Sequence, residues 1–155
     1  MLKVRSADVP VVAGSRYPAP FNLPCQAREV RRLGDAVAMK AFGVSMVRLA
    51  QGTWSAQRHW HSHEDEFVYV LEGTPTLVTD EGEQTLQPGD TVGFPAGEQN
   101  GHCLQNRTPT DVVFLVVANH HDEDHGEYSD IDMKFTKGRY SGASRFVRKN
   151  GVPYE

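Results

Sequence analysis

The sequence is poor in cysteine: only Cys25 and Cys103 occur among its 155 residues. They lie far apart and no CxxC pattern is present, which argues against a disulfide framework and against a cysteine-rich zinc site. Long apolar runs are missing too, because the longest, residues 112–118, is far shorter than the ~20 residues that span a bilayer. The first residues also lack the apolar stretch of a secretory signal peptide. We therefore predict a cytoplasmic protein with no membrane partner.

A surplus of positive charge is absent as well. The formal net charge is −4 at pH 7, so the sequence predicts no nucleic-acid partner. The hydrophobic share of 39% and the charged share of 23% are those of a soluble globular protein. The charge is uneven, however, because residues 122–132 are acidic and residues 137–149 are basic. Such a segment is typically solvated, but its two halves could also pair with each other or with a second subunit.

No window holds a helical hydrophobic period for more than a turn or two. Short apolar runs alternate instead with Gly, Pro and Asp, which is the pattern of an all-β sandwich or small barrel. Residues 79–83, between two such runs, read Thr-Asp-Glu-Gly-Glu and are typical of a hairpin turn. The predicted strands cover residues 36–42, 44–49, 53–61, 66–71, 76–79, 83–86, 91–94, 102–106 and 112–118.

A chain of this length suits a single domain, here residues 1–155. We place its core barrel at about residues 36–119. Residues 1–35 are rich in Pro, Gly and Arg, and we predict an irregular segment that packs on the barrel through its aromatics. Residues 120–155 are predicted to form an extended arm anchored by spaced apolar side chains such as Ile131, Met133 and Phe135. The arm favours a homodimer.

The most informative stretch is residues 59–66, His-Trp-His-Ser-His-Glu-Asp-Glu, which leads directly into an apolar run ending at Gly73. Alternate side chains of a strand share a face, so His59 and His61 would point the same way. Neutral imidazole and carboxylate are the usual ligands for Zn, Fe, Mn or Ni. If the strand that carries His102 lies beside the first, three nitrogens and one oxygen would meet at a point.

Two spaced motifs resemble those of the cupins. The residues that match the first motif are Gly52, His59, His61, Glu66 and Gly73. The residues that match the second are Gly89, Pro95, Gly97, His102 and Asn106. The chain departs from the family pattern by one extra residue before His59 and two before His102, both in loops, where length is tolerated best. A looser likeness along the chain is to small single-domain bacterial cupins, some of which carry the label sugar-phosphate isomerase-like.

The resemblance implies a double-stranded β-helix, a jelly-roll barrel whose two sheets enclose a cavity. It implies one divalent transition metal per chain, with Zn, Mn, Fe and Ni all open, and a homodimer. The implied metal ligands are His59, His61, Glu66 and His102. On a six-coordinate metal these four would leave two adjacent positions open to a chelating substrate, whereas a tetrahedral zinc with the same ligands would be closed.

Other histidines and carboxylates compete for these roles. The pair His61 and His63 also forms His-x-His but lies closer to Glu66 than the family spacing, so we expect His63 to face solvent. A shift of register would replace Glu66 by Glu64 or Asp65. The segment 120–125, His-His-Asp-Glu-Asp-His, could form a second metal site; a solvated turn is the favoured interpretation.

Candidate substrate contacts come from position alone. Gln57 has the strand parity of His59, and Gln99 and Asn100 lie in the loop before His102. The catalytic residues stay unknown, because no nucleophile or base stands out beyond the ligands. A hydrolytic triad and a glycine-rich phosphate loop are both missing from the sequence.

Two functions from different classes fit these observations. The favoured one is a metal-dependent enzyme acting on a small-molecule ligand of the sugar, hydroxy-acid or diketone type, with isomerase, lyase, hydrolase and dioxygenase chemistry all open. The alternative is a non-catalytic small-molecule or metal-binding sensor. An enzyme predicts a metal site that solvent can reach, whereas a sensor or structural site predicts an enclosed one.

Overall fold

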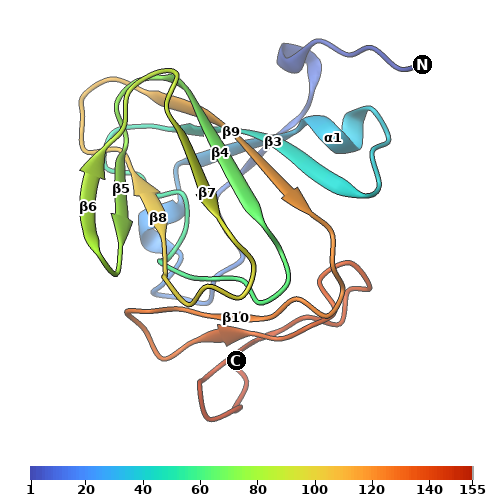
Figure 1. The fold of residues 1–155 in the computed structure, drawn as a ribbon, viewed down its shortest axis with the longest axis vertical. Coiled ribbons are helices and arrows are strands. Elements are labelled where there is room, and N and C mark those ends of the chain that lie inside the picture. Colours follow the sequence, from blue (N-terminus) through green and yellow to red (C-terminus); the bar gives the residue numbers. More distant parts are fainter. Residues whose placement is uncertain (155) are drawn as a thin grey trace.

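Two antiparallel sheets face each other across a common core in the computed structural model, which describes residues 1–154 (Figure 1). The main sheet has the strand order β1-β2-β3-β9-β4-β7. Its strands are β1 (Val11–Ala13), β2 (Arg28–Arg32), β3 (Phe42–Leu49), β4 (Glu66–Glu72), β7 (Thr91–Phe94) and β9 (Val112–Asn119). The facing sheet has the order β6-β5-β8, with β5 (Thr76–Thr79), β6 (Gly82–Thr85) and β8 (Cys103–Gln105). The predicted all-β jelly-roll class is confirmed.

Alternation along the strands decides which side chains fill the barrel. On β4, Val68 and Val70 are fully buried, while Phe67 and Tyr69, which alternate with them, are exposed. The same period of two buries Val112 and Phe114 on β9. The central core also takes residues from the facing sheet, and its buried members are Val47, Leu49, Val68, Val70, Leu77, Leu86, Leu104, Val112 and Phe114.

Gly73 shows why one motif position is a glycine. Its φ is +75°, a conformation that other residues rarely adopt. A Cβ at this position would also lie 2.5 Å from the carbonyl oxygen of Asp111. The turn after β4 therefore needs a residue without a side chain in order to pass the start of β9.

The structure differs from the predicted strands in two places. Residues 36–42 do not form one strand: a short helix, α1 (Leu33–Ala36), is followed by a turn in which Ala38 has a φ of 60°. Residues 53–61 make only isolated bridges, including His59 to His102. The backbone of this segment forms hydrogen bonds to two different segments. His59 pairs with His102, next to β8, while the amide of Trp60 donates to the carbonyl of Glu127. Because the partner changes from one residue to the next, residues 53–61 form no regular strand.

Both ends of the chain are more ordered than the sequence indicated. Residues 11–13 and 28–32 extend the main sheet as β1 and β2, and two short 3₁₀ helices, η1 (Ser6–Asp8) and η2 (Leu23–Cys25), flank β1. The predicted arm folds back into a small sheet of β10 (Gly126–Glu127), β11 (Lys134–Phe135) and β12 (Phe146–Val147). Figure 1 shows this sheet lying across one end of the barrel.

A second apolar cluster fixes the C-terminal sheet to the rest of the molecule. Tyr128, Met133 and Phe135 are buried there against Tyr17 and Phe21 of the N-terminal segment. The two terminal segments therefore stabilise each other. Within residues 1–154, no helix has the length and apolar character that a transmembrane span requires.

Candidate metal centre

The four side chains singled out by the sequence lie together at the end of the barrel that the C-terminal sheet covers. Glu66 is the first residue of β4, and His102 immediately precedes β8. His59 is held beside His102 by two backbone hydrogen bonds of 3.2 and 2.9 Å. Residues from two distant segments are thereby brought to one point.

Their donor atoms face one another. The Nε2 atoms of His59 and His61 are 3.1 Å apart. The Glu66 carboxylate spans the remaining side, with one oxygen 3.7 Å from Nε2 of His61 and the other 3.5 Å from Nε2 of His102. Donor atoms of His59, His61 and Glu66 all lie within 4.8 Å of each other, which is the compactness that a mononuclear site needs.

The protonation states suit metal binding. Burial, together with the neighbouring His61 and His102, lowers the pKa of His59 to about 3, so this imidazole is neutral. Burial alone would raise the pKa of Glu66, but the neighbouring imidazoles, His102 above all, outweigh it and lower the pKa to about 2. A neutral imidazole and an ionised carboxylate are the forms that bind a metal.

The hydrogen bonds on the far side of each ring fix its tautomer. Nδ1 of His59 lies 2.8 Å from the carbonyl oxygen of Gln57, and Nδ1 of His61 lies 2.7 Å from a carboxylate oxygen of Asp124. Both oxygens can only accept, so both Nδ1 atoms carry a hydrogen, and in the neutral form of each ring Nε2 is then the lone-pair nitrogen. Two Nε2 atoms that face each other at 3.1 Å need a shared proton or a metal ion between them, because their lone pairs would otherwise repel.

The ring of His102 is buried without a hydrogen-bond partner for either nitrogen among residues 1–154. Its ring stacks flat on Phe94, with the ring centroids 3.5 Å apart, so it cannot turn away. A buried nitrogen without a partner is costly unless it binds something, and these residues therefore fit a bound metal ion.

Sequence reasoning missed a buried network behind His61. Asp124 is fully buried, and Glu64 is 2% exposed. A guanidinium nitrogen of Arg139 lies 2.8 Å from Glu64 and 3.4 Å from Asp124. The hydroxyl of Tyr140 donates to the other oxygen of Glu64 at 2.5 Å. Carboxylates that hold the outer nitrogen of a metal ligand orient the ring and raise its basicity.

The predicted solvated turn at residues 120–125 is wrong at one residue, Asp124. His121, Glu123 and His125 are exposed, but Asp124 points inward. The hydrogen bond from His61 lowers the pKa of Asp124 to about 2, although burial opposes this shift. No local signal distinguishes Asp124 from its acidic neighbours. His63 is exposed as predicted, with its ring 4.6 Å from that of His121.

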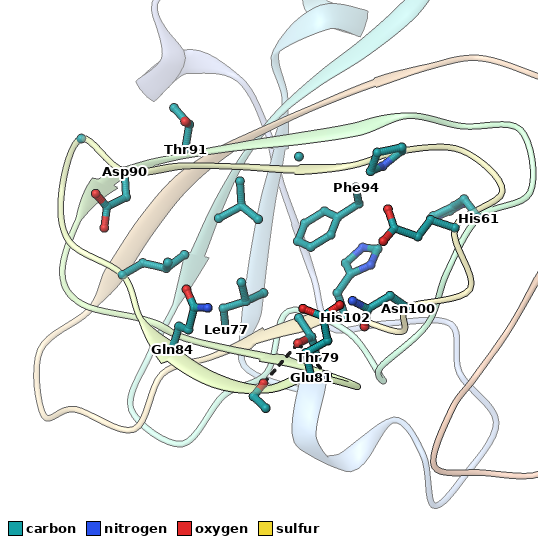
Figure 2. A pocket seen from close by; sticks show the side chains of 17 residues that line it. His61, Leu77, Thr79, Glu81, Gln84, Asp90, Thr91, Phe94, Asn100 and His102 are labelled. Atoms are coloured by element: carbon teal, nitrogen blue, oxygen red, sulfur yellow. Dashed lines mark hydrogen bonds between the residues drawn. The ribbon is translucent and has the colours of Figure 1, made fainter.

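Two cavities meet at these side chains. The first, which we call the edge cavity, has a volume of about 620 Å³ and lies between β5, β6 and β7. Figure 2 shows it with His61, His102 and Phe94 at one end and Asp90 and Gln84 at the other.

The second, the arginine cavity, has a volume of about 470 Å³ and lies between the main sheet and the two terminal segments. Its arginines are Arg16, Arg28, Arg32 and Arg139. All four predicted ligands line the arginine cavity, and two of them also line the edge cavity.

The predicted substrate contacts lie in different places. Asn100 lines the edge cavity, where its side-chain oxygen accepts from the amide of Asp80. Gln57 is buried, and its amide nitrogen donates to the carbonyl oxygen of Phe21 at 2.8 Å, so it anchors the N-terminal segment. Gln99 is exposed in its loop. Neither glutamine is among the residues that line these two cavities.

Comparison with known proteins identifies the family. Residues 45–118 match the model of the cupin domain. A sugar phosphate isomerase of the cupin superfamily from Silicibacter pomeroyi is 42% identical, with 99% of this chain and 97% of that chain covered and a TM-score of 0.94. The chain belongs to the cupin superfamily.

Other solved structures extend the likeness of this cupin. A putative sugar phosphate isomerase from Acidithiobacillus ferrooxidans is 29% identical over 83% of this chain and 81% of that chain, with a TM-score of 0.74. A polyketide cyclase from Streptomyces resistomycificus is 24% identical over 77% and 79% of the two chains, with a TM-score of 0.62, and shares the fold. No curated protein matches the sequence.

Proposed function

We propose that this cupin is a metal-dependent enzyme acting on a small polar metabolite of the sugar, hydroxy-acid or diketone type. The residues that would hold one divalent transition metal per chain are His59, His61, Glu66 and His102. The observation that carries the proposal is the pair of facing Nε2 atoms of His59 and His61, 3.1 Å apart beside the Glu66 carboxylate. The donor set admits Zn, Mn, Fe or Ni.

A bound metal would polarise a substrate oxygen and lower the pKa of a bound water. The chain itself contributes orientation and access. The backbone of Gln57 and the carboxylate of Asp124 hold two of the imidazoles in the binding tautomer. Burial and the hydrogen bond to Glu64 raise the pKa of Tyr140, so this hydroxyl on the wall of the arginine cavity keeps its proton at neutral pH.

Access to the site favours an enzyme over an enclosed structural centre. The donor residues line two cavities, each large enough for a small metabolite. Two similar structures are described as sugar phosphate isomerases, one of them as putative, and this supports a sugar-type substrate. The reaction type is left open, because one fold hosts many chemistries.

Elemental analysis of the untagged protein tests the metal site. We expect about one transition metal per chain in the wild type and loss of it in both His59→Ala and His102→Ala. The matched control is His125→Ala, which removes an exposed imidazole and should keep the metal. Retention of stoichiometric metal in both ligand variants would overturn the assignment.

Turnover is tested on the same preparations. Chelator-treated and metal-reconstituted protein are incubated with aldose and ketose phosphates, 2-hydroxy acids and 1,3-diketones, and conversion is followed by proton NMR. We expect conversion that depends on the metal and disappears in His102→Ala. Saturable ligand binding without conversion would instead support the alternative, a non-catalytic small-molecule or metal-binding sensor.

We also propose a homodimer joined through the outer face of the main sheet. Phe67, Tyr69 and Leu71 are 44%, 37% and 38% exposed along β4. Leu115 and Val117 lie opposite them on β9 and continue the apolar surface. A contiguous apolar face of this kind is typical of a protein contact.

We also propose a cytoplasmic location. Two buried free cysteines are compatible with a reducing compartment, which supports this proposal.

A further inference from the structure

His120 is a half-buried histidine that directly follows β9 and is not one of the proposed metal ligands. It lines the arginine cavity together with Glu64 and Glu66. The neighbouring His121 is exposed and lines neither cavity. One imidazole of residues 120–125 is therefore turned toward the cavity that contains the metal ligands.

The backbone carbonyl of Lys40 fixes which ring nitrogen of His120 carries a hydrogen. Nδ1 lies 2.8 Å from that oxygen, which can only accept. Nδ1 therefore carries a hydrogen, and in the neutral form of the ring Nε2 is the lone-pair nitrogen. Nε2 has no hydrogen-bond partner in the part of the chain that the structure describes. A free acceptor nitrogen beside a cavity is what a general base requires.

A glycine makes room for this ring on the inner face of the main sheet. A Cβ on Gly43 would lie 3.1 Å from Nε2 of His120, so the imidazole lies over Gly43. Gly43 pairs with Ala118 on β9, and Ala118 pairs with Glu66 on β4. Residues that pair directly across antiparallel strands face the same side. The imidazole and the Glu66 carboxylate therefore lie over the two ends of one row, and the methyl group of Ala118 lies between them.

The length of this row suits a small substrate. Two strand spacings separate Gly43 from Glu66, so their backbones are about 9–10 Å apart. A molecule of a few carbon atoms can therefore reach both the metal ligands and the imidazole of His120.

A second series of contacts connects His120 to the metal centre. Its ring centroid lies 4.3 Å from that of Tyr140, whose hydroxyl donates to Glu64. The other carboxylate oxygen of Glu64 lies 3.7 Å from Nδ1 of His61. The position of the His120 ring is thus fixed relative to the ligands from the sheet on one side and from the C-terminal segment on the other.

We propose that His120 is a catalytic acid–base residue that moves a proton between two carbon atoms of a hydroxycarbonyl substrate. The inference rests on the proposed metal-dependent function, because the metal would hold the carbonyl oxygen of the same substrate. It narrows the open reaction types to isomerisation and assigns the arginine cavity as the side on which the substrate lies.

The proton transfer balances within the substrate. A C–H bond next to the carbonyl group breaks, an N–H bond forms at Nε2, and the electron pair of the C–H bond stays on the substrate as an enolate. The proton then returns to the former carbonyl carbon, and the two substrate oxygens exchange a proton through water, which gives the isomer. The reaction consumes no oxidant, reductant or further co-reactant.

The first measurement needs neither metal nor substrate. Chelator-treated protein labelled with ¹⁵N-histidine is studied by long-range ¹H–¹⁵N correlation spectra at about pH 8, where an ordinary imidazole is neutral. The signals that disappear in His120→Gln assign the ring. We expect a hydrogen on Nδ1 and none on Nε2. The opposite tautomer would overturn the proposal, because Nε2 could not then accept a proton.

The second measurement follows the carbon-bound hydrogens. Metal-reconstituted protein is incubated in heavy water with dihydroxyacetone, its phosphate or glycerol, and proton NMR records the replacement of hydrogen by deuterium at carbon. We expect exchange with at least one of the two ketones and none with glycerol, which has no carbonyl group. His120→Gln should slow the exchange at saturating ketone about 100-fold or more, while the half-saturating concentration changes less than about threefold.

Matched variants separate catalysis from local structure. His121→Gln removes the adjacent exposed imidazole and should exchange at the wild-type rate. Gly43→Ala places a methyl group 3.1 Å from Nε2 of His120 and should slow the exchange by displacing the ring. Gly93→Ala is its control, because a Cβ there meets nothing within 4 Å. Neither glycine has a positive φ, so the backbone accepts alanine at both.

The outcomes separate this inference from the proposed function. All four variants should keep the metal content of the wild type in elemental analysis, because none of them removes a ligand. Unchanged exchange in His120→Gln, equal loss in His121→Gln, or no exchange by the metal-loaded wild type with either ketone would overturn the role of His120 and leave the metal site standing. A wild type that binds no metal would instead overturn the proposed function, and the inference with it.

Discussion

Nδ1 of His61 and a carboxylate oxygen of Asp124 lie 2.7 Å apart, although the two residues are separated by 63 positions. The carboxylate is completely buried, and Arg139 balances its charge. Asp124 therefore does for one imidazole what a backbone carbonyl does for His59: it holds the hydrogen on the outer nitrogen and leaves the inner nitrogen free.

Asp124→Asn should weaken metal binding by about 10- to 100-fold, which is the usual effect of losing such an outer carboxylate. The amide keeps the size of the side chain but removes its charge, so His61 loses its fixed tautomer. Competition with a chromophoric chelator measures the dissociation constant. Asp111→Asn, an exposed aspartate paired with Arg48 outside the site, is the control. An unchanged dissociation constant in Asp124→Asn would show that the carboxylate does not orient the ligand.

Arg58→Ala should lower the free energy of unfolding by about 1–2 kcal/mol. Arg58 is only 16% exposed and joins Asp130 of the C-terminal segment to Asp80 of the β5–β6 hairpin. Chemical denaturation followed by circular dichroism gives the value. Arg48→Ala removes an arginine that is 57% exposed and pairs with one aspartate, so it should lower the free energy of unfolding clearly less than Arg58→Ala does. Equal losses in the two variants would contradict a special role for Arg58.

The effect of Arg58 should also depend on pH. The hydrogen bond from Arg58 lowers the pKa of Asp130 below its ordinary value. A depressed carboxyl pKa stabilises the folded state fully above the unfolded pKa, about 4, and the contribution is lost as the pH falls through the folded value. The difference in unfolding free energy between wild type and Arg58→Ala should therefore shrink below about pH 4. A difference in unfolding free energy that becomes larger as the pH falls would contradict this prediction.

Both cysteines should resist alkylation in the native protein. Cys25 and Cys103 are 0% and 2% exposed, and burial raises the pKa of each thiol to about 11. At pH 8 only about one thiol in a thousand is then ionised, and the thiolate is the reactive form. Intact-mass spectrometry after iodoacetamide treatment should show unmodified protein without denaturant and two adducts in guanidinium chloride. Rapid labelling of the native protein would disprove the burial.

Phe67→Glu should convert a dimer into a monomer of 17.2 kDa, because it places a charge in the apolar face of β4 and β9. Light scattering at micromolar concentration measures the mass. Leu2→Glu, at an exposed apolar residue in the N-terminal segment, is the control and should stay dimeric. A wild-type protein that is already monomeric would end the proposal of a dimer.

The barrel could be predicted from the sequence because its signals are local. The alternation that buries Val68 and Val70 lies within one strand, and the hairpin after Thr79 is marked by its turn residues. The family motifs also bring Glu66 and His102 to the neighbourhood of His59 and His61, where the structure places them. These features depend on the spacing of residues along the chain, which can be seen in a single sequence.

The network behind the site could not be predicted, because it depends on contacts between distant segments. Glu64 meets Arg139 and Tyr140 across 75 and 76 positions. Asp124 is flanked by exposed acidic residues of the same type. Residues 36–42 were predicted as a strand from composition, but a helical turn at Gly34 ends the preceding strand and delays β3 until Phe42. Only the folded chain decides these points.

The C-terminal sheet docks so closely that a Cβ on Gly126 would lie 1.9 Å from the carbonyl oxygen of Trp60. During synthesis, a nascent chain that has emerged only as far as residue 119 already contains both sheets of the barrel and all four histidine and glutamate donors. Such a chain lacks Asp124 and Arg139, which hold the imidazole of His61 in place. The candidate centre is therefore completed by a segment that follows the barrel in the sequence, and we expect a chain that ends at residue 119 to bind a metal ion more loosely than one that includes the C-terminal sheet.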